Sequence, residues 1–155
     1  MRICTLTRAA GIVVLAFAVV APVPFLAEED HPAAGVALAG YCPVAYAAMG
    51  KVVKGKEKFA VEYDGKTYYM ANGKAKTMFN ESPETYAVAY DGWCATGMAH
   101  GMKVATAPDQ FIVRDGTTYL FANAEAKMMF EKDAAGVISK ADANWSKTAH
   151  AGHGH

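Results

Sequence analysis

The feature that most constrains the fold of this chain is an internal repeat. The sequence YDGKTYYMANGKAKTMF at residues 63–79 matches RDGTTYLFANAEAKMMF at residues 114–130, 51 residues later. Upstream, Cys42 and Cys94 align 52 residues apart, which places one lost residue in the strand before the second Asp-Gly pair. A match this dense indicates two copies of one supersecondary unit. Each copy is too small to bury a complete core, so we expect the copies to pack on each other.

The repeated unit has the pattern of a β-hairpin followed by a helix. Apolar residues alternate on both sides of the Asp-Gly pairs at 64–65 and 115–116. Such a pair predicts a two-residue turn, because both turn positions take positive φ. Asn72 and Asn123 then stand where a helix N-cap is expected. The predicted fold class is therefore α+β, with two pseudo-repeated hairpin–helix units packed as one small domain.

The helices expected after each hairpin are short. The sequences GKAKTMF and AEAKMMFEKD should form them, with inward-facing Met78, Phe79, Met129 and Phe130. A further helix is expected at Ser82, as cap, followed by Pro83 in the first turn. Tyr86 and Tyr90 are four residues apart and would share one face of that helix.

The N-terminus differs from the rest of the chain. Arg2 and Arg8 precede an apolar run at residues 11–20, and Pro22 and Pro24 follow it. A spanning helix needs ~20 apolar residues, so the pattern favours a secretory signal, with an uncleaved anchor as the alternative. We expect an exported protein, periplasmic in a Gram-negative bacterium, that meets the membrane only through this segment.

The chain divides into three expected regions. Residues 1–39 would be the signal peptide and leader, and residues 40–147 the duplicated domain, with units at 40–91 and 92–147. Residues 148–155 have no core pattern and are expected to be a mobile tail. Its histidines, His150, His153 and His155, would provide at most an auxiliary metal-capture site.

Charge and motifs exclude several classes of function. The chain has 15 basic and 15 acidic residues, a net charge of zero, and no basic stripe, which argues against nucleic acid as a partner. No Ser-His-Asp order, phosphate-binding loop, HExxH or CxxC sequence occurs. We therefore expect a protein that is not an enzyme.

The stretch WCATGMAHGM at residues 93–102 contains the strongest candidate site. Cys94, Met98, His100 and Met102 bring a thiol, two thioethers and an imidazole within nine residues. Thiolate and thioether ligands select Cu(I), and imidazole accepts either copper state. Cysteine and methionine are also common core residues, so simple packing is the competing interpretation.

Cys42 is the fifth candidate ligand. Cys4 would leave with the signal, so Cys42 and Cys94 are the thiols of the exported protein. In an oxidising compartment the two could form a disulfide, which needs Cα atoms within ~7 Å. Reduced, they could form a two-thiolate metal site. Both alternatives require the two repeats to bring the cysteines together.

The chain resembles the YHS domain over residues 40–147. The resemblance rests on YCPVAY at 41–46, the hairpin YDGKTYYMA, the segment MFNESPETYAVAYDGWCATGMAHG, and KADANW at 140–145. It is closest to the exported, cysteine-poor branch of that family. The resemblance implies an exported or metal-associated domain, because YHS domains occur beside copper-transport modules.

The metal ligands implied by the wider family are missing here. Its opening cysteine falls on Ala45, and its helix pair falls on Ala71 and Ala75, or on Ala122 and Ala126 in the second copy. None of these can bind a metal, so the family's metal role cannot be carried over to this chain residue by residue.

These patterns lead to one expected function and two alternatives. We expect an exported soft-metal protein, with copper as its ion, that handles or buffers the metal and meets a metal-transport or metalloenzyme partner. The first alternative is a structural or interaction module that has lost its metal site. The second is an enzyme accessory subunit with an aromatic pocket, suggested by Tyr41, Tyr46, Tyr63, Tyr68, Tyr69, Tyr86, Tyr90, Trp93 and Trp145.

Overall fold

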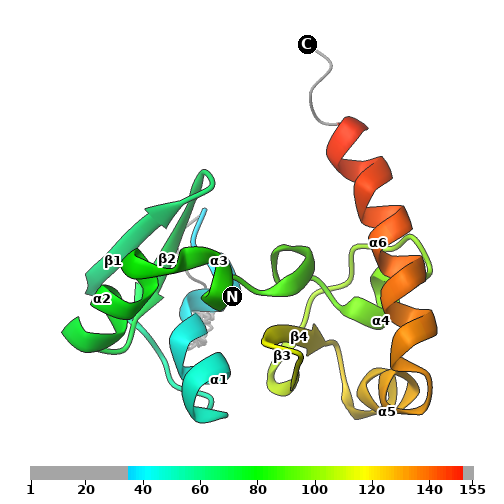
Figure 1. Cartoon of the computed structure of the whole chain (residues 1–155), viewed down its shortest axis with the longest axis horizontal. Helices are drawn as coiled ribbons and strands as arrows, with labels where there is room; N and C mark the ends of the chain where they lie inside the picture. Colours follow the sequence, from blue (N-terminus) through cyan, green and yellow to red (C-terminus); the bar gives the residue numbers. More distant parts are fainter. Residues whose placement is uncertain (1–34, 152–155) are drawn as a thin grey trace, which may run out of the picture. The chain divides into compact units, whose positions relative to one another are not determined.

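The computed structural model describes residues 35–151, and their side chains as far as Thr148. Helices and two separate antiparallel hairpins make up this part of the chain, which confirms the α+β class (Figure 1). The apolar N-terminal run and the side chains of the tail histidines lie outside the described residues. No helix within residues 35–151 has the length and apolar character needed to cross a bilayer.

The elements fall into two halves that follow each other along the chain. The first half contains η1 (Ala37–Gly40), α1 (Pro43–Met49), β1 (Lys56–Tyr63), β2 (Lys66–Met70), α2 (Gly73–Glu81) and α3 (Pro83–Tyr86). The second contains η2 (Ala89–Gly92), α4 (Ala95–Ala99), β3 (Ala107–Arg114), β4 (Thr117–Phe121), α5 (Ala124–Lys132) and α6 (Ala134–Ala151). Figure 1 shows each half gathered around its own hairpin.

Both hairpins turn at their Asp-Gly pairs, as predicted. Asp64 and Gly65 have φ of 49° and 69°, and Asp115 and Gly116 have φ of 52° and 81°. The positive values at both positions match the backbone twist of the flanking strands. Each pair of strands also shifts register once, between Lys56 and Ala60 in β1 and between Ala107 and Phe111 in β3.

The two predicted asparagine caps are confirmed. The side-chain oxygens of Asn72 and Asn123 each accept a hydrogen bond from the backbone N–H three residues on, at 2.9 Å. Each cap satisfies one of the unpaired N–H groups at the start of its helix. Ser82 differs, since its side chain makes no capping hydrogen bond, although Pro83 does begin α3.

Corresponding elements of the two halves have the same local geometry. Cys42 N–H donates to the Val53 carbonyl at 2.9 Å, and Cys94 N–H donates to the Val104 carbonyl at 3.0 Å. The spacing between these partners is eleven residues in the first half and ten in the second. The lost residue therefore lies between Cys94 and Val104, around α4, and its predicted place in the strand was wrong. The origin of the halves by duplication stays a prediction.

Each half has its own apolar core, and a third cluster joins them. Phe79 and Met70 are buried in the first core, and Phe121 and Phe130 in the second. The joining cluster contains buried Tyr46, Val88 and Leu120, with Leu38, Tyr41 and Phe111 packed against it. The halves therefore pack on each other, as expected for units too small to stand alone.

The helix α6 was not anticipated, and it changes the C-terminal boundary. It runs from Ala134 through Ala151, past the boundary expected at residue 147. The carboxylate of Asp133 accepts a hydrogen bond from Gly136 N–H at 3.0 Å, which caps its first turn. The helix covers α4, where Asn144 donates to the carbonyls of Met98 and Ala99 at 3.0 and 3.2 Å. These carbonyls end α4, and that of Met98 also accepts a hydrogen bond from Gly101 N–H at 2.9 Å.

The N-terminal boundary of the fold lies before residue 40. Val36 pairs with Thr67 in a parallel bridge, and Ala37 is buried in the core of the first half. The boundary expected after Ala39 would remove both, so residues 35–39 belong to the domain. The predicted Tyr86–Tyr90 helix face was also wrong, because α3 ends at Tyr86 and Tyr90 lies in η2 with φ of 54°.

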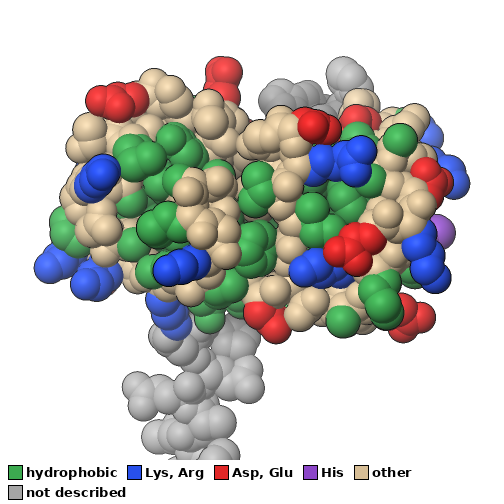
Figure 2. Space-filling view, turned by 60° about the horizontal axis from the view of Figure 1, so that its bottom comes forward, with side chains coloured by type: hydrophobic (Ala, Val, Ile, Leu, Met, Phe, Trp, Pro, Cys, Tyr) green, Lys and Arg blue, Asp and Glu red, His purple; other side chains and the backbone are tan. Residues whose placement is uncertain are grey.

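Several apolar side chains remain at the surface. Figure 2 shows apolar side chains exposed between lysines and carboxylates on one face of the molecule. Among the described residues, the large exposed ones are Met49, Val52, Met102, Val113, Met128 and Met129. Met129 is 46 % exposed, so its predicted inward orientation was wrong, whereas Phe130 beside it is buried.

Candidate functional site

The predicted metal cluster begins at the start of α4. Cys94 is its N-cap, and the sulfur accepts a hydrogen bond from Gly97 N–H at 3.4 Å. Met98 follows one turn later, with its N–H bonded to the Cys94 carbonyl at 2.8 Å. Both side chains are buried in the core of the second half, at 2 % and 0 % exposure. The two side chains share one cluster because residues four apart on a helix lie on the same face.

The other two members of the cluster lie at the surface. The helix α4 ends at Ala99, His100 is its C-cap, and Gly101 takes a φ of 75°. This turn leads the chain out of the core, so His100 is exposed and Met102 is 55 % exposed. The four predicted ligands are therefore divided between the core and the surface. Within residues 35–151, no group of three or more His, Cys, Asp or Glu side chains is arranged to hold a metal ion.

Cys42 lies apart from Cys94. Each is a free, buried thiol at the start of a short helix, Cys42 in the core of the first half and Cys94 in that of the second. The structure thus contains neither the disulfide nor the shared two-thiolate site that the sequence left open.

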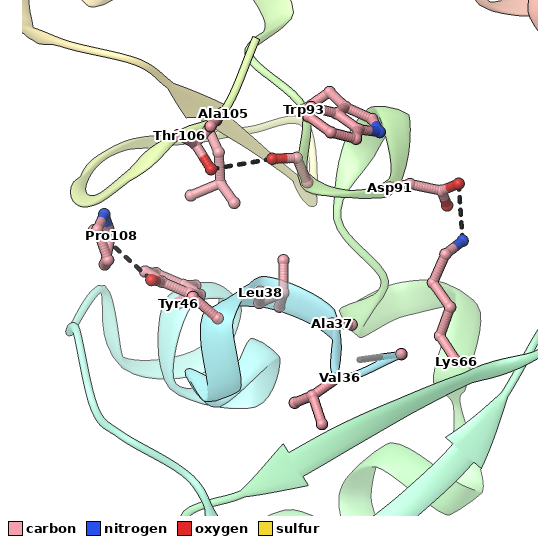
Figure 3. A pocket seen from close by; sticks show the side chains of 14 residues that line it. Val36, Ala37, Leu38, Tyr46, Lys66, Asp91, Trp93, Ala105, Thr106 and Pro108 are labelled. Carbon is pink, nitrogen blue, oxygen red and sulfur yellow. Dashed lines mark hydrogen bonds and ion pairs between the residues drawn. The ribbon is translucent and has the colours of Figure 1, made fainter. Parts of the chain in front are cut away.

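A pocket of about 360 Å³ lies where the halves meet. Figure 3 shows it between η1 and α1 of the first half and η2, the loop before β3, and β3 of the second. Its walls are mostly apolar and include Val36, Leu38, Tyr46, Trp93, Pro108 and Leu120. A concave site with apolar and aromatic walls and a few polar groups is the usual form of a small-molecule site.

Three polar interactions surround this pocket (Figure 3). The Tyr46 hydroxyl donates to the Pro108 carbonyl at 3.0 Å, and Lys66 Nζ pairs with Asp91 Oδ2 at 2.7 Å. Both of these join one half to the other. The Thr106 hydroxyl donates to the Gly92 carbonyl at 2.9 Å. Burial raises the pKa of Tyr46 above its ordinary value, so its hydroxyl remains a neutral donor near neutral pH.

The backbone around the pocket is strained. Leu38, Ala39, Tyr90 and Asp91 have φ of 57°, 50°, 54° and 56°, in the left-handed region that L-residues avoid. Such a conformation costs roughly 1–2 kcal/mol per residue. All of these residues except Tyr90 line the pocket. Strain held in place by surrounding structure tends to cluster at functional sites, so it is a second feature that marks this region.

Sequence reasoning identified part of this pocket but not its place. Tyr46 and Trp93 were among the aromatic residues from which an aromatic pocket was suggested as an alternative. Lys66 and Asp91 carried no such signal, because they come from separate elements, β2 and η2. Their proximity depends on how the halves pack.

Comparisons with known proteins returned no matching family model, curated protein or solved structure. The resemblance to the YHS domain therefore stays a prediction.

Proposed function

We propose that this protein is a non-catalytic binding module that holds a small molecule with an apolar body in the pocket between its halves. The observation that carries the proposal is the pocket itself, with apolar and aromatic walls contributed by both halves. The strained backbone of η1 and η2 supports it. The proposal develops the aromatic-pocket alternative and places the protein in an exported compartment, in line with its N-terminal sequence.

The expected affinity follows from the number of ligand atoms that the pocket can hold. A ligand of about ten non-hydrogen atoms, at an intermediate ~0.5 kcal/mol per atom, would bind with ~5 kcal/mol. That corresponds to a dissociation constant of hundreds of micromolar. Calorimetry with millimolar concentrations of a small probe therefore suffices to detect binding.

Filling the pocket should abolish this binding. Ala105 is an exposed lining residue in the loop before β3, so Ala105→Trp should occupy the pocket without disturbing the core. We expect at least a tenfold loss of affinity for the neutral probe 3-phenylpropan-1-ol, measured by calorimetry on the full chain. The matched control is Ala143→Trp, at an exposed position of α6 outside the pocket. Equal binding by both variants and the unmodified chain would contradict the proposal.

Soft-metal binding is the second candidate, and one observation favours it. Cys94 and Met98 lie one turn apart in the same buried cluster. Two sulfur ligands suit Cu(I). His100 and Met102 follow directly on an exposed turn and would complete the site only if that turn moved. A metal-transport or metalloenzyme partner would belong to this function.

A Cu(I) titration tests this candidate. The reduced full chain, titrated against a competing chelator, should bind one ion, and Cys94→Ser should lose that binding. Cys42→Ser is the matched control, because Cys42 is equally buried at the start of α1 but has Tyr46 four residues later in place of a methionine. Circular dichroism would verify that both variants fold. Copper binding that survives in Cys94→Ser would contradict a site in this core.

A further inference from the structure

The charged groups of the pocket offer a way to identify its ligand. Among the described residues that line it, Lys66 and Asp91 carry formal charge. Their side chains are paired at 2.7 Å and are 31 % and 33 % exposed, so the pair meets both the pocket and solvent. A charged ligand that enters the pocket must displace one member of this pair.

The two members are not equally easy to displace. Asp91 has a short side chain on a backbone held at φ of 56° between Tyr90, which is buried, and Gly92. Lys66 has a long, flexible side chain next to the hairpin turn, and its ammonium group can rotate into water. An entering cation can therefore take the place of Lys66 on Asp91, whereas an anion would require the more constrained Asp91 to leave.

The hydroxyl groups of the pocket also favour a cationic ligand over an anionic one. Tyr46 and Thr106 have already donated their hydrogens, to the carbonyls of Pro108 and Gly92. What these hydroxyls still offer to a ligand is oxygen lone pairs, which accept hydrogen bonds. Tyr46 is 1 % exposed, so the accessible hydroxyl is that of the partly exposed Thr106. A ligand with N–H donors can use its lone pairs, and a carboxylate or phosphate cannot.

The carboxylates beside the pocket also favour a cationic ligand. Burial raises the pKa of Tyr68 to about 12, and the negative charges of Asp91 and Asp64 add to the shift. Trp93 is a partly exposed residue of the pocket wall, and an aromatic ring attracts a cation by about 0.5–2 kcal/mol when the cation lies over its face.

We infer that the pocket selects an organic cation, an amine or guanidinium group carried on an apolar body, with Asp91 as its anionic partner. This inference rests on the proposed function and names the class of ligand. The apolar body would lie against Leu38 and Leu120, and the charged end would replace the ammonium of Lys66.

Three probes that share the same phenylpropyl body and differ in charge test the inference. They are 3-phenylpropan-1-amine, 3-phenylpropan-1-ol and 3-phenylpropanoate, each titrated into the full chain by calorimetry. We expect the amine to bind about tenfold more tightly than the alcohol, and the carboxylate to bind more weakly than both. Asp91→Asn should remove the preference for the amine and leave the affinity for the alcohol unchanged, since asparagine tolerates the left-handed backbone.

The matched variant is Lys66→Met, which removes the competing cation while keeping a long apolar side chain. It should bind the amine several-fold more tightly than the unmodified chain does, the opposite of Asp91→Asn. A carboxylate that binds most tightly, or an amine preference unchanged in Asp91→Asn, would overturn the inference. If the alcohol binds and the amine binds no better, only the inference fails. If none of the three probes binds, the proposed function fails.

Discussion

Replacing Tyr46 with alanine is expected to lower the free energy of unfolding by about 3–5 kcal/mol. Tyr46 is 1 % exposed and belongs to the cluster that joins the halves. Its ring meets Phe111 of β3 edge-on at a centroid distance of 4.9 Å. Truncation leaves a large cavity where the halves meet, and urea unfolding of the full chain measures the loss.

Tyr46→Phe is the control for this prediction. It keeps the ring and removes the hydrogen bond to the Pro108 carbonyl, so it should cost about 1 kcal/mol. A cost below about 1 kcal/mol for Tyr46→Ala would contradict the role assigned to the joining cluster.

Gly55→Ala is expected to destabilise the protein by about 3 kcal/mol, the upper end for an overpacked site. A Cβ atom at Gly55 would fall on the backbone carbonyl group of Tyr69 in β2. That backbone cannot retreat easily, because Tyr69 pairs with Ala60 across the hairpin. Gly55 N–H also donates to the Gly40 carbonyl at 2.8 Å, which holds η1 in place, and urea unfolding again gives the loss.

Gly73→Ala provides a matched glycine control. Gly73 begins α2, and the nearest atom to an added Cβ is Phe59 Cε1 at 3.9 Å, an ordinary contact. Alanine also favours the helix, so this variant should be within about 0.5 kcal/mol of the unmodified chain, or slightly more stable. Equal destabilisation by both substitutions would show that steric conflict at Tyr69 is not the cause at Gly55.

The parts of the fold that the sequence predicted are those set by local chemistry. The Asp-Gly turns and the caps at Asn72 and Asn123 depend on neighbouring residues alone, and all of them are present. Phe79 and Phe130 were predicted to face inward and are buried. The turn and cap signals act within four residues, so packing elsewhere in the chain does not override them.

The parts that were missed depend on contacts between distant segments. Helix α6 is an exception, because Val137, Ile138, Ala141 and Trp145 have helical spacing after the cap at Asp133, which is a local signal. Whether Met129 is buried depends on what covers α5. Nothing local distinguishes Met129 from Phe130.

The candidate site shows the same division. Cys94 and Met98 are four residues apart and lie one helical turn apart, but spacing carries no information on burial. The turn at Gly101 sends His100 and Met102 to the surface. The pocket is assembled from η1, α1, β2, η2 and the loop before β3, and only the packed halves bring these together.

Binding of a small apolar-bodied molecule in the pocket between the halves should be visible at one of the two tryptophans of the chain. Trp93 lines the pocket, whereas Trp145 lies outside it, in α6 against Tyr90 at a ring distance of 6.1 Å. We would titrate the nitrogen-15-labelled full chain with 3-phenylpropan-1-ol and follow both indole N–H signals. We expect a saturable shift of the Trp93 signal, while the Trp145 signal stays in place. No shift of Trp93, or equal shifts of both signals, would contradict it.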